Sequence, residues 1–441
     1  MSRGPVDADV RLHWPGRRAV SLPDPVARTP LLRFGDGPVQ AELVFADAAA
    51  ALSTLCAERG DGFADLVYLD PPFGTGDAHG RRLTLTTPVG SAPITLPAYD
   101  DAQPLAAWLE GMERVLRGCH RALAPHGTLY LHIDWRRGAH LRLLLDEIFG
   151  TDALRNEIVW AYGLGGAARD RFARKHDTIL SYARDPAACF FRPVLEAATS
   201  SRLRGQPKLA RDVWTSADAE PETPIDRAWP DPVFELTLSN RDPQRTGYPT
   251  QKPDALADRI VAASLPDGGL LLEPMAGSGA LGAAALRRGG RALLVDRGAV
   301  ALDTCRGRCA AAGVGYRLDV LATAQLPTTL TLAAPLALRA AEDGRVELRP
   351  LSGVLRPAAC RPGDRATLEA LATEDARALL SAWGFARRAD DGGWQVLDVD
   401  DQGAAQHRRA PTALTPRAGA THVFAIDLWG GWHVAALDAA R

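Results

Sequence analysis

Short apolar runs alternate along the chain with longer segments in which apolar residues recur every three to four positions. Runs of strand length are typical of strands buried on both faces, whereas the longer spacing is typical of amphipathic helices. We therefore expect an α/β fold with a mostly parallel sheet flanked by helices. The predicted strands are residues 41–47, 66–70, 127–135, 270–273, 291–296 and 315–319; the predicted helices are residues 48–59, 104–123, 140–149 and 256–263, a segment between 280 and 291, and a segment after 296.

Some segments do not follow this alternation. Residues 1–38 are rich in Arg and Pro and are interpreted as an extension that lies on the core. Residues 74–97 are polar and contain prolines, which predicts a long loop covering an active site, because loops of this length are uncommon elsewhere. Residues 326–441 mix short strands with an Ala-rich helix near 365–384 and a hairpin around 430–431. This last segment suits either a DNA-contacting or dimerisation module or a stabilising cap.

The charge of the chain restricts how it can contact nucleic acid. Lys and Arg number 51 against 53 Asp and Glu, so such contact requires a local basic surface. The segment from Arg169 to Asp212 contains ten Lys or Arg and five Asp or Glu. This surplus favours a DNA-contacting insertion over a merely solvated face.

The cysteines and the apolar runs indicate the compartment. The six cysteines lack metal-ligand spacing, so we expect ordinary thiols and no bound metal. No apolar run approaches the length of a membrane span, and the N-terminus has no secretory apolar region. We therefore expect a cytoplasmic protein with no membrane partner.

Asp70, Pro71, Pro72 and Phe73 directly follow the apolar run 66–69. Open α/β sheets place their chemistry at the carboxyl ends of strands. Consecutive prolines have a restricted φ and no N–H, so their carbonyls act only as acceptors. This arrangement suits a flat amine held by the Asp70 carboxylate and the Pro71 carbonyl, with Phe73 stacked on its ring. The alternative interpretation is a strand that ends in a Pro-Pro turn.

A second pattern begins at residues 270–273, where a strand, a small-residue turn, a helix and a strand ending in Asp296 follow one another. This is the pattern of nucleotide-binding sites, with glycines for close backbone approach and an acid for ribose hydroxyls. Upstream, Thr250 and Lys252 near a helix start can hold a carboxylate, the alternative being a Pro-initiated helix with an exposed Lys. Asp47 suits a place beside a cofactor adenine and, equally, a helix N-cap.

Together the two patterns resemble the amino-group DNA methyltransferases that use S-adenosylmethionine, in the permuted arrangement with the Asp-Pro-Pro-aromatic motif before the cofactor loop. Residues 146–150, 155–160 and 171–182 look like the type III modification-like, adenine-specific branch. The resemblance implies a circularly permuted, Rossmann-like methyltransferase sheet with an inserted target-recognition region and a small C-terminal α+β module. It divides the chain into an N-terminal extension (1–38), a catalytic half (39–163), a basic insertion (164–245), a cofactor-binding half (246–325) and a C-terminal accessory module (326–441).

The resemblance also implies the reaction and the residues that perform it. A methyl group passes from S-adenosylmethionine to the N6 amine of an adenine flipped out of double-stranded DNA. A homodimer and a restriction subunit stay open as further partners. The implied residues are Asp70, Pro71, Pro72 and Phe73 for catalysis; Asp47, Asp70, Thr250, Gln251, Lys252, Glu273, Ala276, Gly277, Ser278, Gly279 and Asp296 for the cofactor; and Arg171, Arg174 and Lys175 for DNA.

Two assignments stay open at the level of single residues. Asp319 ends a predicted strand and competes with Asp47 for the place beside the cofactor adenine. His132 and Asp134 alternate to one face of a predicted strand and form a candidate proton-shuttling pair, although strand-end polar residues usually satisfy neighbouring loops.

Two alternative functions also stay open. The first is transfer to the N4 amine of cytosine; resembling cytosine enzymes more often begin the motif with Ser, so Asp70 favours adenine. The second is a DNA-binding protein that keeps the fold without turnover. It is motivated by Glu273, where the family usually has Asp, by Ala280, where it often has Thr, and by the neutral overall charge.

Overall fold

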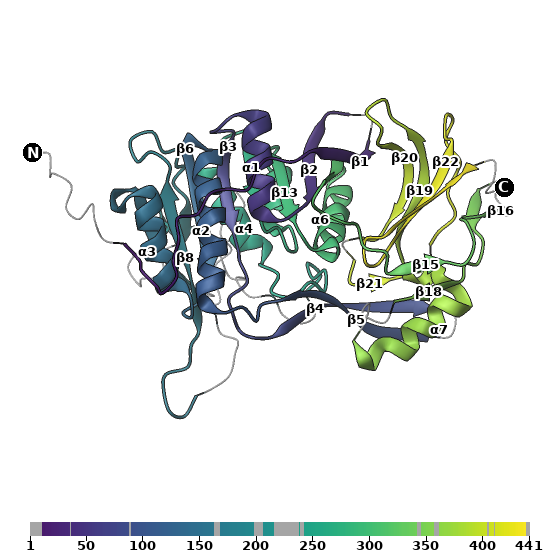
Figure 1. The fold of residues 1–441 in the computed structure, drawn as a ribbon, viewed down its shortest axis with the longest axis horizontal. Coiled ribbons are helices and arrows are strands. Elements are labelled where there is room, and N and C mark those ends of the chain that lie inside the picture. Colours follow the sequence, from purple (N-terminus) through teal and green to yellow (C-terminus); the bar gives the residue numbers. More distant parts are fainter. Residues whose placement is uncertain are drawn as a thin grey trace, which may run out of the picture.

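The computed structural model describes residues 11–35, 37–87, 90–162, 168–197, 206–215, 238, 242–341, 345–356, 361–403, 405–409 and 411–437. Over these residues the chain forms a 14-stranded sheet with helices against its faces (Figure 1). Its central strands are, in spatial order, β8 (His176–Ala183), β6 (Leu123–Ile133), β3 (Ala64–Leu69), β12 (Leu270–Glu273), β13 (Arg291–Asp296), β2 (Val39–Phe45) and β14 (Gly315–Leu321).

The strands from β6 to β14 are parallel to one another. The chain passes from β3 to β6 on one side of the β3–β12 junction and from β12 to β13 on the other, so the strand order reverses there. Ligands of open α/β sheets bind at the carboxyl ends of the strands at such a reversal. The junction brings Asp70, after β3, beside Glu273, at the end of β12. The predicted mostly parallel, permuted α/β fold is confirmed.

Alternating side chains of the strands bury against helices on the two faces of the sheet. Val67 and Leu69 belong to an apolar cluster with residues of three helices, α1 (Ala48–Arg59), α2 (Leu105–Ala122) and α3 (Gly138–Phe149). Leu66 and Tyr68 belong to a second cluster with residues of α4 (Asp254–Ser264) and α5 (Ala280–Arg287). This alternation, which follows from the two-residue period of a strand, produces three layers. Two further helices are α6 (Ala299–Ala311) and α7 (Arg365–Asp375).

The expectation that residues 1–38 form an extension lying on the core is wrong for residues 28–34. They form β1 (Arg28–Phe34), which pairs antiparallel with β14 and parallel with β20 (Trp394–Asp401). The sheet thereby continues into the C-terminal residues, as Figure 1 shows by the purple β1 next to the yellow strands. These strands are β20 (Trp394–Asp401), β19 (Leu380–Arg388), β22 (His422–Asp427) and β23 (Trp432–Ala436).

The C-terminal elements match the sequence prediction in part. β22 and β23 are antiparallel on either side of Gly430 and Gly431, which confirms the hairpin. The helix predicted near 365–384 is too long, because α7 ends at Asp375 and residues from Leu380 enter β19. The short elements nearby are η3 (Pro362–Asp364), η4 (Ala376–Leu379), β15 (Leu330–Leu332), β16 (Leu338–Ala340), β17 (Val346–Leu348) and β18 (Gly353–Leu355).

The long loop predicted over residues 74–97 is also wrong. These residues form the antiparallel hairpin of β4 (Ala78–Thr87) and β5 (Gly90–Asp100). β21 (His407–Arg408) pairs in parallel with β4, so the hairpin reaches from the main sheet to the C-terminal residues (Figure 1).

The basic insertion predicted over residues 164–245 contains a strand of the core. β8 lies between β6 and β7 (Leu154–Ala161) and is antiparallel to both. Outside the described residues lie 163–167, 198–205, 216–237 and 239–241, so nearly half of the predicted target-recognition region is among them. The remaining short elements here are η1 (Thr151–Ala153), β9 (Leu195–Ala197), β10 (Pro207–Leu209) and β11 (Val213–Thr215).

Candidate active site

A cavity of about 700 Å³ opens at the carboxyl ends of β3 and β12. It is lined by residues that the sequence places in separate halves of the chain. Most of the predicted catalytic and cofactor residues are among them, which brings both predicted motifs to one site. They are Asp47, Asp70, Pro71, Pro72, Phe73, Thr250, Lys252, Glu273, Ala276, Gly277, Ser278 and Asp296.

The Asp70 carboxylate is held on one side only. Its Oδ2 accepts a hydrogen bond from Lys252 Nζ at 2.5 Å. Its Oδ1 is buried and finds no hydrogen-bond partner among the described residues. Trp108 Nε1 donates to the Pro72 carbonyl at 3.1 Å, which anchors the Pro-Pro turn to α2. The site therefore presents one oriented acceptor with an unmet hydrogen bond, a condition that folded proteins rarely leave without a function.

Phe73 packs against a buried histidine. Its ring stacks on the His132 imidazole with the centroids 6.0 Å apart. His132 Nδ1 bonds with the Tyr68 hydroxyl at 3.0 Å, and His132 Nε2 bonds with Asp177 Oδ2 at 3.2 Å. Burial, with a contribution from the nearby Lys252 ammonium, lowers the pKa of His132.

The predicted proton-shuttling pair of His132 and Asp134 is wrong. Asp134 instead forms an ion pair with Arg136 and accepts from the Arg136 backbone N–H at 2.8 Å. The partner of His132 is Asp177, on the antiparallel neighbour β8, and its carboxylate also accepts from Tyr162 at 3.1 Å. Sequence reasoning missed this pair because it depends on which strand lies next to β6.

The turn after β12 has the backbone that its glycines predict. Gly277 and Gly279 have φ of +51° and +67°, a region that side chains with a Cβ rarely adopt. A Cβ at Gly277 would lie 3.3 Å from Tyr248, and a Cβ at Gly279 would lie 2.8 Å from Cys305 Sγ. Gly277 lines the cavity and leaves its backbone open to a ligand there, whereas Gly279 lets the turn pack closely against α6.

Asp296 lines the cavity and also supports this turn. Its Oδ2 accepts from the Gly277 N–H at 2.9 Å, and its Oδ1 accepts from the Gly298 N–H at 2.7 Å. Burial raises the pKa of this carboxyl. The side chain therefore has a structural task in addition to the predicted contact with ribose hydroxyls.

Glu273 is 3% exposed at the end of β12. Its Oε2 accepts from the Gly282 N–H at 2.9 Å. Burial raises the pKa of Glu273 to about 8. A buried carboxyl of this kind is suited to a cationic group of a ligand, because an opposite charge favours its ionised form.

Glu273→Gln is expected to make the free protein less sensitive to alkaline pH. The pKa of Glu273 in the folded protein is about 8, above the value of about 4.3 for an unfolded chain. The folded state therefore binds the extra proton, and the free energy of unfolding falls as the pH rises from about 4.3 toward 8. In thermal unfolding at acidic and alkaline pH, the wild-type melting temperature should fall further than that of the variant. Equal pH dependence would contradict the raised pKa; the exposed Glu110→Gln is the matched control.

The structure places Asp47 and Asp319 differently. Asp47 lines the cavity, and its Oδ1 accepts from the Ala49 N–H at 2.9 Å as the N-cap of α1. The two interpretations of Asp47 are therefore compatible. Asp319 is not among the residues that line this cavity; it forms ion pairs with Arg28 at 3.0 Å and Arg317 at 3.2 Å.

Thr250 and Gln251 also have different surroundings. Thr250 lines the cavity with a positive φ of 54°, and its hydroxyl bonds with that of Tyr99 at 3.1 Å. Such strained backbone occurs often at functional sites. The assignment of Gln251 to the cofactor has no support in its position, because it does not line the cavity. Its amide accepts from Thr246 and donates to the Gln244 carbonyl, so it shapes the turn before α4.

The β4–β5 hairpin lines the cavity, so the segment predicted as a loop covering an active site does lie at the site, but as paired strands. His79, Tyr99 and Asp101 line the cavity, and the His79 and Tyr99 rings stack at 4.6 Å. Asp101 accepts from the backbone N–H groups of Thr75 at 3.0 Å and Gly76 at 2.8 Å. Asp101 therefore ties the hairpin to the segment that follows Phe73.

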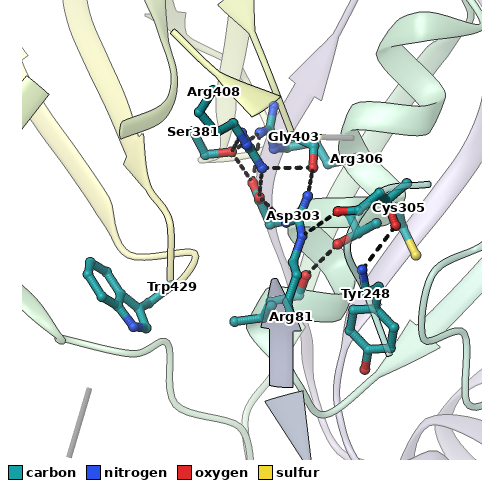
Figure 2. A network of polar contacts seen from close by, with 12 residues as sticks. Arg81, Tyr248, Asp303, Cys305, Arg306, Ser381, Gly403, Arg408 and Trp429 are labelled. Carbon is teal, nitrogen blue, oxygen red and sulfur yellow. Dashed lines mark hydrogen bonds and ion pairs between the residues drawn. The ribbon is translucent and has the colours of Figure 1, made fainter. Parts of the chain in front are cut away.

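A buried arginine cluster joins this hairpin to α6 and to the C-terminal residues (Figure 2). Arg81, on β4, donates to Asp303 at 3.2 Å and to the carbonyl of Gly403 at 2.5 Å. Arg306 also donates to Asp303, at 2.8 Å, and Arg408 donates to Gly403 at 3.0 Å. Removing one partner of a buried ion pair costs about 3–5 kcal/mol. These contacts support a stabilising role for the C-terminal residues.

The predicted DNA-binding residues lie just before β8. Arg171 forms an ion pair with Asp170 at 2.7 Å. The Arg174 guanidinium lies 3.4 Å from the centroid of the Trp135 ring. The Lys175 carbonyl accepts from the Tyr162 N–H at 2.9 Å.

The sheet, the reversal of strand order and the cavity at the carboxyl ends of the strands are those of an open α/β fold with a ligand site at the reversal. Residues 64–305, more than half of the chain, match the DNA methylase family. The chain belongs to this family of DNA methylases. Among the described residues, the helices are too short or too polar to cross a bilayer.

Several curated relatives are similar over part of the chain. The Type II methyltransferase M.HpaI of Haemophilus parainfluenzae is 27% identical over 54% of this chain and 64% of its own length. The Type II methyltransferase M.EcaI of Enterobacter cloacae is 31% identical over 46% and 44%. The DNA adenine methyltransferase YhdJ of Escherichia coli K12 is 24% identical over 56% and 75%. The chain thus spans less than two thirds of M.HpaI and of M.EcaI.

Two solved structures are also similar. The complex of M1.HpyAVI with SAM has a TM-score of 0.39 and 14% identity over 61% of this chain and 98% of that one. The PvuII DNA methyltransferase, described as cytosine-N4-specific, has a TM-score of 0.40 and 12% identity over 64% and 89%.

Proposed function

We propose that the protein is a site-specific DNA methyltransferase that transfers a methyl group from S-adenosylmethionine to the N6 amine of an adenine in double-stranded DNA. The proposal depends on the Asp70 carboxylate, which lines the cavity with Oδ2 paired to Lys252 and Oδ1 without a partner among the described residues. An exocyclic amine is the donor that this oxygen lacks. Because that amine is enclosed in a duplex, the base must leave the stack to reach the cavity.

The residues at the end of β12 fit S-adenosylmethionine. Gly277 lines the cavity without a Cβ, which lets a ligand lie against the backbone, and the buried Glu273 carboxyl suits the ligand's ammonium group. Asp296 lines the same cavity and can accept from ribose hydroxyls, and Asp47, which also lines it, suits a place beside the cofactor adenine. When bound, the cofactor supplies a methyl group on a sulfonium.

The residues that follow β3 hold and orient the acceptor base. Asp70 Oδ1 and the Pro71 carbonyl accept hydrogen bonds from the two hydrogens of the amine, which directs the nitrogen lone pair toward the methyl group. Phe73, whose ring is stacked on His132, stacks in turn on the base. The rate then depends on proximity and orientation, without a covalent enzyme intermediate.

The identity of the methylated base tests the proposal. The protein is incubated with S-adenosylmethionine labelled in the methyl group and with unmethylated genomic DNA, which is then digested to nucleosides. Label in N6-methyl-2′-deoxyadenosine supports the proposal. Label in N4-methylcytosine supports the cytosine alternative, which the same Asp70 geometry allows. Binding of the cofactor without transfer to any DNA supports a DNA-binding protein that has lost turnover.

Replacing Arg171, Arg174 and Lys175 together with Ala is expected to weaken DNA binding and flatten its salt dependence. Each phosphate contact that is lost should reduce the slope of log K against log salt by about one unit. Fluorescence anisotropy with a labelled duplex over a series of salt concentrations measures the slope. A variant of Arg339 and Arg365, exposed arginines of the C-terminal residues, is the control. An unchanged slope would assign the three residues to a solvated face.

A further inference from the structure

An exposed aromatic side chain stands among cations before β8. Phe172 is 97% exposed, and Trp135, after β6, is 49% exposed. The Trp135 ring lies 3.4 Å from the Arg174 guanidinium and 5.0 Å from that of Arg136. We call Trp135, Phe172 and Arg174 the aromatic patch. A phenyl ring that contacts water over nearly its whole surface gives the fold no apolar stabilisation and is accessible to a partner.

The aromatic patch lies at the same edge of the sheet as the catalytic motif. β6 is parallel to β3, so Trp135 follows β6 at the edge where Asp70 follows β3. β8 is antiparallel to β6, so the residues before His176 return to that edge. The stacking of Phe73 on His132 and the bond of His132 to Asp177 form a continuous link from the cavity to the start of β8.

The chemistry of the patch favours a nucleic acid over an apolar partner. Residues 169–175 contain four Lys or Arg against one Asp. Flat rings beside guanidinium groups provide stacking surfaces for bases together with charges for phosphates. A protein groove or a lipid surface would use a broader apolar area than a single phenyl ring with an indole held under a guanidinium.

We propose that Phe172 enters the base stack of the duplex as the target base leaves it, while Trp135 and Arg174 contact the neighbouring nucleotide. The inference rests on the proposed function and adds the residue that opens the duplex. Removing a base from the stack costs free energy, which an inserted apolar side chain offsets by restoring contact with the neighbouring bases. The benefit is largest where the target base is both stacked and paired, and this defines the test.

The test uses Phe172→Ala and two oligonucleotide substrates. The methylated site is first identified by modified-base sequencing of DNA treated with the wild-type protein. One duplex then carries this site fully paired, and the other carries an abasic position opposite the target base. On the paired duplex we expect the variant to be about 5- to 150-fold slower, the factor that stacking on one base provides. On the abasic duplex, where the target base leaves the stack more easily, the variant should lose a clearly smaller factor, and Phe172→Trp should retain activity on both.

Phe191→Ala is the matched control. Phe191 is 55% exposed, and its neighbour Phe190 donates to the carbonyl of His126, near the other end of β6. This variant should match the wild type on both substrates. Equal rates of Phe172→Ala and wild type on the paired duplex would overturn the inference, as would an equal loss on both duplexes. In either case wild-type transfer to DNA would leave the proposed function standing, whereas no wild-type transfer to any DNA would remove both.

Discussion

Asp70→Ala is expected to reduce methyl transfer below about a tenth of the wild-type rate, a loss of more than about 1.4 kcal/mol of transition-state stabilisation. The variant removes the buried Oδ1, the acceptor that has no partner among the described residues. It also removes the Oδ2 that pairs with Lys252 at 2.5 Å. The acceptor amine would then lack its orienting group. Single-turnover transfer of a labelled methyl group to DNA measures the loss.

The same substitution leaves the Lys252 ammonium, 7% exposed, without its carboxylate. Unpaired buried charge destabilises a fold, so the melting temperature and the cofactor affinity must be measured beside the rate. Asp70→Ala combined with Lys252→Met removes the unpaired charge, and its transfer should stay as low as that of Asp70→Ala. Asp61→Ala, which removes an exposed carboxylate before β3, should leave all three quantities unchanged. A rate above a tenth in the folded Asp70→Ala variant would mean that Asp70 does not hold the amine.

The sequence predicts the parts of the site that depend on local pattern. The apolar run before Asp70 and the one that ends at Glu273 form buried strands because strand-length apolar segments suit a doubly covered sheet. The glycines of the turn indicate the positive φ that the structure has at Gly277 and Gly279. Since parallel strands align their carboxyl ends, the two motifs meet once the strands are adjacent.

The parts that could not be predicted depend on pairing between distant segments. Prolines in residues 74–97 favour a loop, yet Pro93 and Pro97 lie on β5, an edge strand of its sheet. An edge strand tolerates proline because one row of its backbone groups is unpaired. β1 similarly gains its place from β14 and β20, hundreds of residues later in the chain. The spacing of apolar residues within one segment does not show which distant strand will pair with it.

Gly277→Val is expected to raise the cofactor dissociation constant by at least about tenfold, equivalent to about 1.4 kcal/mol. The residue has a φ of +51°, and a Cβ there would lie 3.3 Å from Tyr248. A β-branched residue is strained in this conformation. It also occupies the space over which a ligand would approach the backbone. Isothermal titration of the folded variant with S-adenosylmethionine measures the constant.

Phe73→Ala, in contrast, should leave the cofactor dissociation constant within a few-fold of the wild type and reduce methyl transfer. Phe73 stacks on His132 at the side of the cavity that follows β3, and base stacking contributes about 1–3 kcal/mol. Gly289→Val separates backbone strain from obstruction, because Gly289 has a φ of +74° with nothing within 4 Å of an added Cβ. This control should lose stability and keep cofactor affinity. An equal loss of cofactor affinity in Gly277→Val and Phe73→Ala would show that the turn after β12 and the motif after β3 do not bind cofactor and base separately.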